Sequence, residues 1–257
     1  MTTAPAAFYG QPSMLRKRTL STVSMGALLV LCTLAFVATG CGGGDDTNEN
    51  PSEFEELLPQ VVLVEEDLTT GIQRVSAFFS TNQDVADAVI DTEGELAKLE
   101  GWGRVLGYDA QFEPGPEAPV GTEVQGVQST ASVYATTQGA ADSYAEAVSD
   151  ARDTAWEERY PGVADLEVEE VDRSDLADEY VWFRISGLDE NSGKLVIDDQ
   201  VAFRVGSVRG FLRVVTVFDA SEPRDVYQDE VAEWVRLLAA RIAGSAIMGG
   251  VSATATP

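Results

Sequence analysis

The sequence predicts an α+β fold, in which a largely antiparallel sheet of six to seven strands packs with about three amphipathic helices. Short runs of alternating apolar and polar residues recur between residues 73 and 217, as is typical of half-buried strands. Longer stretches repeat apolar residues at three- and four-residue steps, which indicates helices with one apolar face. Hairpin-like connections between the strands favour an antiparallel sheet with helices layered against it.

The strands are expected where β-branched and aromatic residues alternate with polar ones between turn-forming residues. In chain order these segments are residues 73–80, 103–112, 124–135, 166–171, 180–186, 201–205 and 208–217. Before them, residues 54–68 are rich in leucine and valine but are interrupted by Pro59. We therefore expect an irregular entry segment there.

Three helices are expected, each opened by a residue whose side chain can cap the free amides of the first turn. They cover residues 82–99, 136–160 and 221–242, with Asn82, Thr136 or Thr137, and Ser221 as the caps. Gly94 is a possible break in the first helix. Gly244 lies just past the end of the third, where glycine favours the end of a helix.

The best-defined hairpin joins the last two strands through Gly206-Ser207, a two-residue loop with glycine first. This register sets Val205 opposite Val208 and Val201 opposite Leu212. Since side chains alternate between the two faces of a strand, one face of the hairpin is expected to be core. That face holds Val201, Phe203, Val205, Val208, Leu212, Val214 and Phe218.

The same register places Arg204 directly opposite Arg209, with Arg213 further along that face. By its parity Arg184 is expected to join them from a neighbouring strand. Opposed like charges destabilise a sheet, so acidic side chains or an anionic ligand should lie between them. Arginine suits carboxylate or phosphate, and these four residues are the predicted ligand-binding group. The alternative is that Asp and Glu residues pair with them in ordinary salt bridges.

The N-terminal residues have the pattern of an export signal. Arg16, Lys17 and Arg18 precede an apolar run from residue 25 to residue 37, which is short for a membrane span. Ala38-Thr39-Gly40-Cys41 follows, and this segment resembles the lipobox of bacterial lipoproteins. The resemblance implies cleavage before Cys41 and attachment of lipid to its sulfur and amine, which would hold the chain at the membrane. An ordinary secreted protein and an uncut signal anchor are the alternatives.

Four segments follow from this interpretation. Residues 1–40 are the lipoprotein signal peptide, and residues 41–53 are the lipidated cysteine with a disordered acidic tether. Residues 54–244 form a single α+β domain, and residues 245–257 form a disordered tail. The predicted location is the cell membrane, lipid-anchored, on its extracytoplasmic side.

Composition excludes several classes of function. The chain has no histidine, so histidine-based catalysis and histidine metal sites are ruled out. All 43 acidic residues follow residue 40, whereas three of the 17 basic ones leave with the signal, so the exported chain carries a net charge of −29. A surface this acidic repels nucleic acid. The acidic clusters lack the spacing of a calcium loop, and we expect neither a metal nor a cofactor.

Three short motifs suggest a relationship for the body of the chain. They are Gly-Tyr-Asp-Ala at 107–110, Ser-Val-Tyr at 132–134 before an alanine-rich helix, and Phe-Arg-Val-Gly at 203–206. Their order resembles PsbP-like exported actinobacterial lipoproteins and the sensor domain of mycobacterial serine/threonine kinases. We therefore expect a non-enzymatic domain that binds a small anionic ligand or an envelope protein. A carboxylate-dependent hydrolase of the envelope and a structural or assembly lipoprotein are the alternatives.

Overall fold

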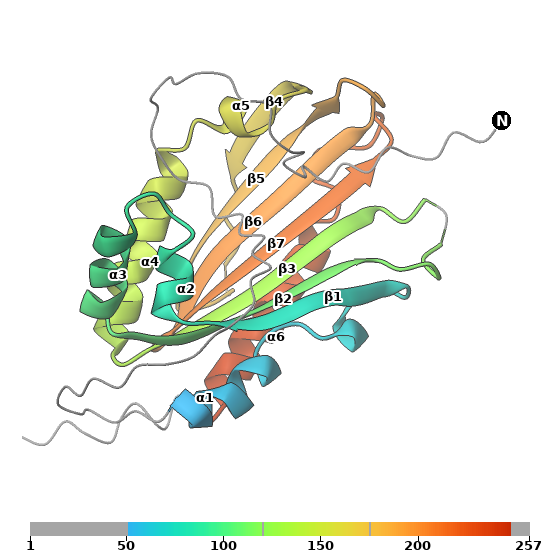
Figure 1. The fold of residues 1–257 in the computed structure, drawn as a ribbon. Helices are drawn as coiled ribbons and strands as arrows, with labels where there is room; N and C mark the ends of the chain where they lie inside the picture. Colours follow the sequence, from blue (N-terminus) through green and yellow to red (C-terminus); the bar gives the residue numbers. More distant parts are fainter. Residues whose placement is uncertain (1–50, 120, 175, 248–257) are drawn as a thin grey trace, which may run out of the picture.

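The computed structural model describes residues 51–119, 121–174 and 176–247, so the leader and Cys41 lie outside the described residues. Seven antiparallel strands form one sheet in the order β1-β2-β3-β7-β6-β5-β4, which confirms the predicted fold class (Figure 1). The strands are β1 (Ile72–Ser80), β2 (Arg104–Pro114), β3 (Val124–Tyr134), β4 (Val163–Glu170), β5 (Glu179–Asp189), β6 (Leu195–Val205) and β7 (Val208–Phe218). The edges of the sheet are β1 and β4.

Helices pack around this sheet. They are α1 (Pro51–Leu57), α2 (Asn82–Ala86), α3 (Thr92–Gly101), α4 (Thr137–Arg152), α5 (Trp156–Arg159) and α6 (Gln228–Gly244). Two short 3-10 helices, η1 (Leu58–Gln60) and η2 (Glu65–Asp67), link α1 to β1. None of the helices in the described ranges is long and apolar enough to cross a membrane.

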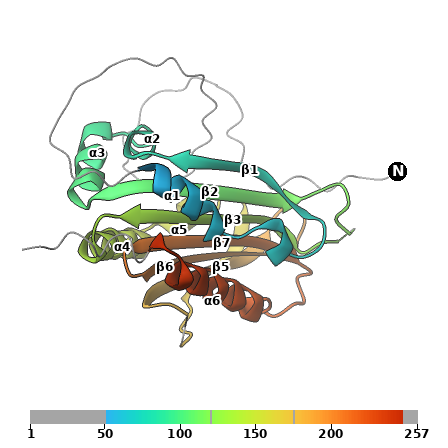
Figure 2. The same ribbon diagram turned by 90° about the horizontal axis from the view of Figure 1, so that it is seen from below.

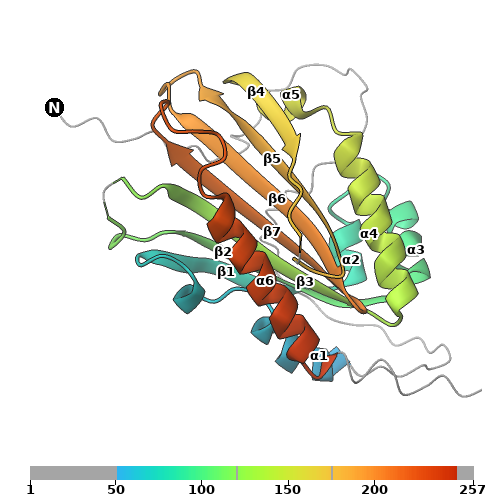
Figure 3. The same cartoon turned by 180° about the vertical axis from the view of Figure 1, so that it is seen from behind.

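One face of the sheet, here called the covered face, packs against α6, which runs diagonally across it (Figure 3). Val231, Val235 and Leu238 of α6 are fully or almost fully buried. They join the largest hydrophobic cluster, to which the inward residues of β6 and β7 also belong. Burial of this apolar area supplies most of the driving force for folding. Seen from below, α1 and α6 lie on this same side of the strands (Figure 2).

The opposite face, here called the outer face, is covered only in part. α4 and α5 pack over β5, where Trp156 meets Val181, Phe183 and Ile185. α4 also contacts β3, β6 and β7. In Figure 1 the outer face is turned toward the viewer, with α2, α3 and α4 gathered at one end of the strands. Helices therefore border this face of the sheet instead of sealing it.

The β6–β7 hairpin has the predicted register. Val205 pairs with Val208, Val201 with Leu212, and Arg204 with Arg209. Gly206 has φ of +57°, the left-handed region in which glycine is strongly favoured. All seven residues of the predicted core face are buried, at 9% exposure or less. The turn and the alternation of side chains are both local, and this is why the sequence identifies them.

The helix boundaries differ from the prediction. The expected helix 82–99 is two helices, separated at residues 87–91 and not at Gly94. Thr81 and not Asn82 caps α2, by accepting a hydrogen bond from the Asp84 amide. Asp91 caps α3 by accepting one from the Gly94 amide. A new cap therefore starts a new helix just before the glycine that the sequence suggests as a break.

The two later helices are also shorter than expected. α4 has its predicted cap, Thr136, but ends at Arg152, and a separate turn, α5, follows it. α6 begins at Gln228, because Tyr227 before it has φ of +71° and cannot continue a right-handed helix. Ser221, the predicted cap, lies in the preceding loop.

Both ends of the predicted domain extend further than expected. Residues 51–53, assigned to the tether, belong to α1. Ile247, assigned to the disordered tail, is fully buried in the main hydrophobic cluster. The rest of the predicted tether and tail lies outside the described residues.

Candidate functional site on the outer face

The outer face carries a row of residues, polar apart from one glycine, near the end where α2 and α4 lie. Each member is the direct cross-strand partner of the next, from β1 through β2, β3, β7 and β6 to β5. The row consists of Ser80, Gly107, Ser132, Arg209, Arg204 and Glu179. We call it the basic row. Direct cross-strand partners have Cβ atoms about 5 Å apart, so these side chains form one surface feature.

Arg204 has an acidic partner within the basic row. Its Nε donates to Glu179 Oε2 at 2.6 Å, and its Nη1 donates to the Gly206 carbonyl at 2.8 Å. The Arg204 side chain is 12% exposed. Arg204 is therefore held in an ion pair with the adjacent strand, which is the alternative that the sequence left open.

Arg209, the residue opposite, is paired differently. Its Nη1 donates to the carbonyl and the hydroxyl of Ser143 on α4, at 3.2 and 2.8 Å. The Ser143 hydroxyl also lies 2.6 Å from the Tyr134 hydroxyl. Among the described residues, no carboxylate makes an ion pair with Arg209. Its partners are neutral, so its charge is not compensated locally.

Arg104 is a site residue that the sequence interpretation missed. It begins β2, is 6% exposed, and lies beside the basic row. Its Nη1 donates to the Ser80 carbonyl and to Asn82 Oδ1, both at 3.1 Å, and its Nη2 donates to the Ser80 hydroxyl at 2.8 Å. Burial lowers the pKa of Arg104 to about 10, and the charge of Arg209 acts in the same direction. No local pattern reveals this residue, because its surroundings come from three separate segments.

A second row lies further along the outer face and crosses all seven strands. It consists of Ser76, Gln111, Gln128, Arg213, Gln200, Phe183 and Glu170. We call it the polar row. Arg213 donates to Asp198 in a two-pronged ion pair at 2.6 to 3.0 Å. Asp198 is 1% exposed, and its charge raises the pKa of Arg213.

Hydrogen bonds fix the side chains on either side of Arg213. Tyr160, after α5, donates to Asp198 at 2.6 Å, and Gln200 donates to the Tyr160 hydroxyl at 3.1 Å. Between the two rows, Asp109 accepts from Gln128 at 2.6 Å and from Thr130 at 2.7 Å. The polar side chains of the outer face are thus positioned by one another before any ligand arrives.

Arg184 does not join the other predicted arginines. It lies on the covered face, on the same side of β5 as Trp182, which is fully buried. Its guanidinium donates to both oxygens of Asp199 at 2.7 Å, and Nη1 reaches the carbonyls of Arg224 and Val226. The expected parity was wrong because the Trp182 side of β5 faces α6. Arg204, Arg209 and Arg213 do share the outer face.

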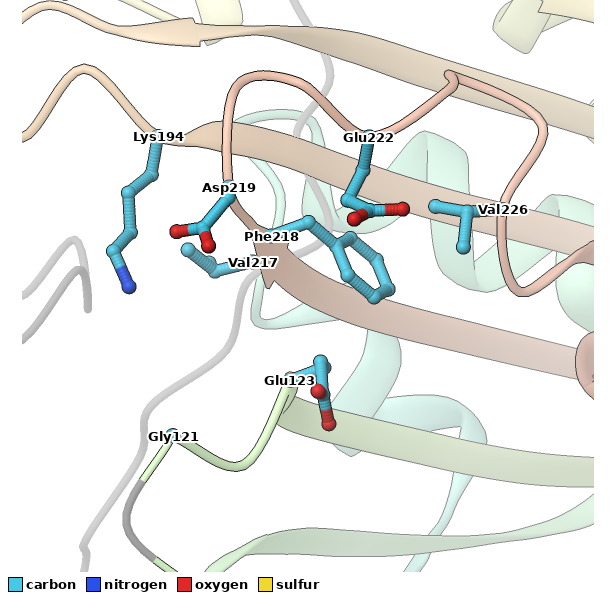
Figure 4. Close-up of a pocket in the computed structure, with 8 residues that line it drawn as sticks. All are labelled: Gly121, Glu123, Lys194, Val217, Phe218, Asp219, Glu222 and Val226. Carbon is cyan, nitrogen blue, oxygen red and sulfur yellow. The ribbon is translucent and has the colours of Figure 1, made fainter.

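A cavity of about 420 Å³ lies at the far end of the sheet, away from the basic row (Figure 4). Glu123, just before β3, and Asp219 and Glu222, after β7, contribute carboxylates, and Lys194 contributes the cation. Phe218, Val217 and Val226 form its apolar part. None of the predicted arginines lines this cavity. In the described parts of the chain, no three Asp, Glu or Cys side chains are placed so that they could hold one metal ion.

Comparisons with known proteins give no sequence match for this chain and a weak structural similarity. No family model matches it, and no curated protein matches it significantly. Among solved structures, it is similar to the extracellular domain of PknH from Mycobacterium tuberculosis. The TM-score is 0.45 and the sequence identity 8%, over 74% of this chain and 97% of that chain. A likeness at this level does not establish a shared function.

Proposed function

We propose that this chain is an extracytoplasmic lipoprotein, anchored through lipid on Cys41, whose domain binds a ligand or partner on its outer face without catalysing a reaction. The observation that carries the proposal is the asymmetry of the sheet. α6 together with α1 and η1 covers the covered face, while the outer face presents two rows of mostly polar residues between bordering helices. Binding surfaces gain affinity when their polar groups are already positioned, and the bonds around Asp109 and Arg213 do this.

The four predicted arginines differ in how well each could contact a ligand. Arg209 and Arg213 lie in the basic and polar rows with at least part of their surface exposed, so both can meet a ligand. Arg204 is paired with Glu179 and Arg213 with Asp198, and Arg184 is buried on the covered face against the loop that precedes α6. An anionic ligand is therefore expected at Arg209, the one of the four whose partners among the described residues are neutral.

The anchor is tested by labelling cells with an alkyne fatty acid and comparing Cys41→Ser with Cys32→Ser. Cys32 lies inside the apolar run of the leader, so its thiol is the matched control. The proposal expects Cys41→Ser to lose the label and to leave the membrane fraction, while Cys32→Ser behaves as the wild type. Label retained by Cys41→Ser would refute the anchor.

Binding on the outer face is tested by hydroxyl-radical footprinting of the chain in intact membranes and after purification. Phe78, which is 42% exposed, and the half-buried Phe211 lie on the outer face, and Leu237 on α6 is the control. The two phenylalanines should be oxidised less in membranes than after purification, and Leu237 equally in both. Equal oxidation of Phe78 and Phe211 in both preparations would contradict the proposal.

A further inference from the structure

Most buried or half-buried arginines of this domain have a carboxylate partner. Ion pairs join Arg184 to Asp199, Arg204 to Glu179, Arg213 to Asp198 and Arg241 to Asp67. The chain has 43 acidic residues, so carboxylates are abundant. Arg104 and Arg209 nevertheless make no ion pair with any residue that the structure describes. Their lack of acidic partners results from where they lie and not from a shortage of acids.

Hydroxyl groups lie next to these two arginines. Ser132 is the direct cross-strand partner of Arg209 on one side and of Gly107 on the other. Its hydroxyl accepts from Arg104 Nε at 3.4 Å, a long contact that leaves the hydroxyl proton available. Ser80 contributes a second hydroxyl to Arg104. Two guanidinium groups and neighbouring hydroxyls are the donors with which proteins bind oxyanions.

Gly107 lies directly beneath this cluster of side chains, on β2. A Cβ atom at this position would lie 2.1 Å from Arg104 Nη2, 2.6 Å from the Ser80 hydroxyl and 3.0 Å from the Ser132 hydroxyl. The Arg104 guanidinium therefore lies directly over the backbone of β2. Only a residue without a side chain allows this approach.

Two cations in one cluster, neither of them in an ion pair with a described carboxylate, are unfavourable, because each is partly removed from water and repels the other. An anion between them would relieve both effects. Arg209 is the more accessible of the two arginines, because it is half-buried. Its hydrogen bonds to α4 use only Nη1, so its other nitrogens can donate to a ligand. Arg104 is the buried wall.

We propose that Arg104, Arg209 and the hydroxyl of Ser132 form a binding site for a small oxyanion, such as a phosphate, sulfate or carboxylate group. This inference rests on the proposed binding role of the outer face and names the chemistry of the ligand. It moves the anion site away from Arg184, Arg204 and Arg213, whose charges are already compensated by Asp and Glu.

The experiment is differential scanning fluorimetry of the full chain in detergent at constant ionic strength. Sodium phosphate, glycerol phosphate, sodium sulfate and sodium acetate are each titrated against sodium chloride. At least one of the four anions should raise the melting temperature in proportion to the logarithm of its concentration above Kd, as preferential binding to the native state requires. Comparing the four separates free phosphate, phosphate ester, sulfate and carboxylate as the preferred group.

Variants locate the site. Arg209→Gln is expected to weaken anion affinity about tenfold, as the loss of a charge-assisted hydrogen bond implies. Arg236→Gln on the exposed side of α6 removes the same charge elsewhere and should change the affinity less than about twofold. Ser132→Ala, which keeps both arginines, should weaken affinity about threefold and guards against misfolding of the arginine variant.

The inference would be overturned if none of the four anions raised the melting temperature above the sodium chloride control, or if Arg209→Gln and Arg236→Gln had equal affinity. These failures are distinct from failure of the proposed function. If Phe78 and Phe211 are protected in membranes while no anion binds, the outer face binds something else and only the oxyanion site is wrong. If an anion binds at Arg209 without protection in membranes, the site stands and the proposed partner on the outer face does not.

Discussion

Arg204 and Arg209 are directly opposed across the β6–β7 hairpin, yet within the described residues only Arg204 has a carboxylate partner. Glu179 on β5 lies beside Arg204, whereas the other neighbour of Arg209 is Ser132 on β3. One of the two like charges is thus neutralised by the sheet and the other faces neutral groups. Arg204 is therefore a structural residue, whereas Arg209 is a candidate for ligand binding.

The ion pair between Arg184 and Asp199 should be costly to break. Both side chains are at most 1% exposed, and Asp199 also accepts from Trp182 Nε1 at 2.6 Å. Arg184→Met leaves the Asp199 carboxylate buried without a cation, which is expected to reduce the free energy of unfolding by about 3–5 kcal/mol. Urea denaturation measures this loss. Arg236→Met on the exposed side of α6 should change it by less than about 0.5 kcal/mol, and an equal effect of the two variants would refute burial as the cause.

Gly107→Ala should destabilise the domain by about 1–3 kcal/mol, because the new methyl group overlaps Arg104 and Ser80. The matched control is Gly101→Ala at the end of α3, where a Cβ meets no atom within 4 Å. Alanine favours helix over glycine by up to about 1 kcal/mol, so the control should be neutral or stabilising. Thermal unfolding compares the two. A Gly107→Ala protein as stable as the wild type would show that Arg104 is free to move aside.

Two isoleucines test whether the segment after α6 belongs to the core. Ile247 is fully buried, whereas Ile90 is 95% exposed. Ile247→Ala should cost about 2–5 kcal/mol of unfolding free energy, the range for removing a buried isoleucine side chain. Ile90→Ala should change it by less than about 0.5 kcal/mol. Chemical denaturation of both variants measures these losses. Similar small losses in the two variants would show that Ile247 does not contribute to the core, as expected for the disordered tail that the sequence predicts.

Tyr160 should make the domain sensitive to alkali. Burial raises the pKa of its phenol, and the neighbouring Asp198 carboxylate raises it further. An unfolded tyrosine ionises near pH 10, so above this pH the unfolded chain binds fewer protons at this residue than the folded one. Stability from Tyr160 is therefore present below about pH 10 and lost as the pH rises.

Tyr160→Phe removes this group, and the fall in unfolding free energy between about pH 10 and pH 11 should become shallower. The measurement is urea denaturation at several pH values in this range. A Tyr160→Phe variant with an unchanged alkaline slope would show that the phenol does not keep its proton in the folded state.

The sequence predicts those parts of the fold that depend on neighbouring residues. The β6–β7 hairpin has its predicted register because a two-residue turn fixes which side chains oppose each other. The helix boundaries were less predictable. Each depends on the backbone conformation of a single residue, such as the cap Asp91 or the left-handed Tyr227. Any of several polar residues nearby could have served as the cap.

The candidate site was predicted only where it lies on that hairpin. Arg204, Arg209 and Arg213 share a face because they occupy alternating positions on two consecutive strands. Arg184 was assigned to the wrong face, because alternation along β5 says which residues share a side but not which side faces α6. Arg104 was missed because Ser80, Asn82 and Ser132 surround it only after the strands pair.

By itself, the sequence determined the fold class, the strand alternation and the hairpin register, since each follows from local spacing and from the separation of apolar and polar residues. Tertiary structure alone decided that β3 lies beside β7, which brings Ser132 next to Arg209. It also decided which arginines meet carboxylates. These are contacts between segments distant in the chain, and their energies depend on packing that no local pattern records.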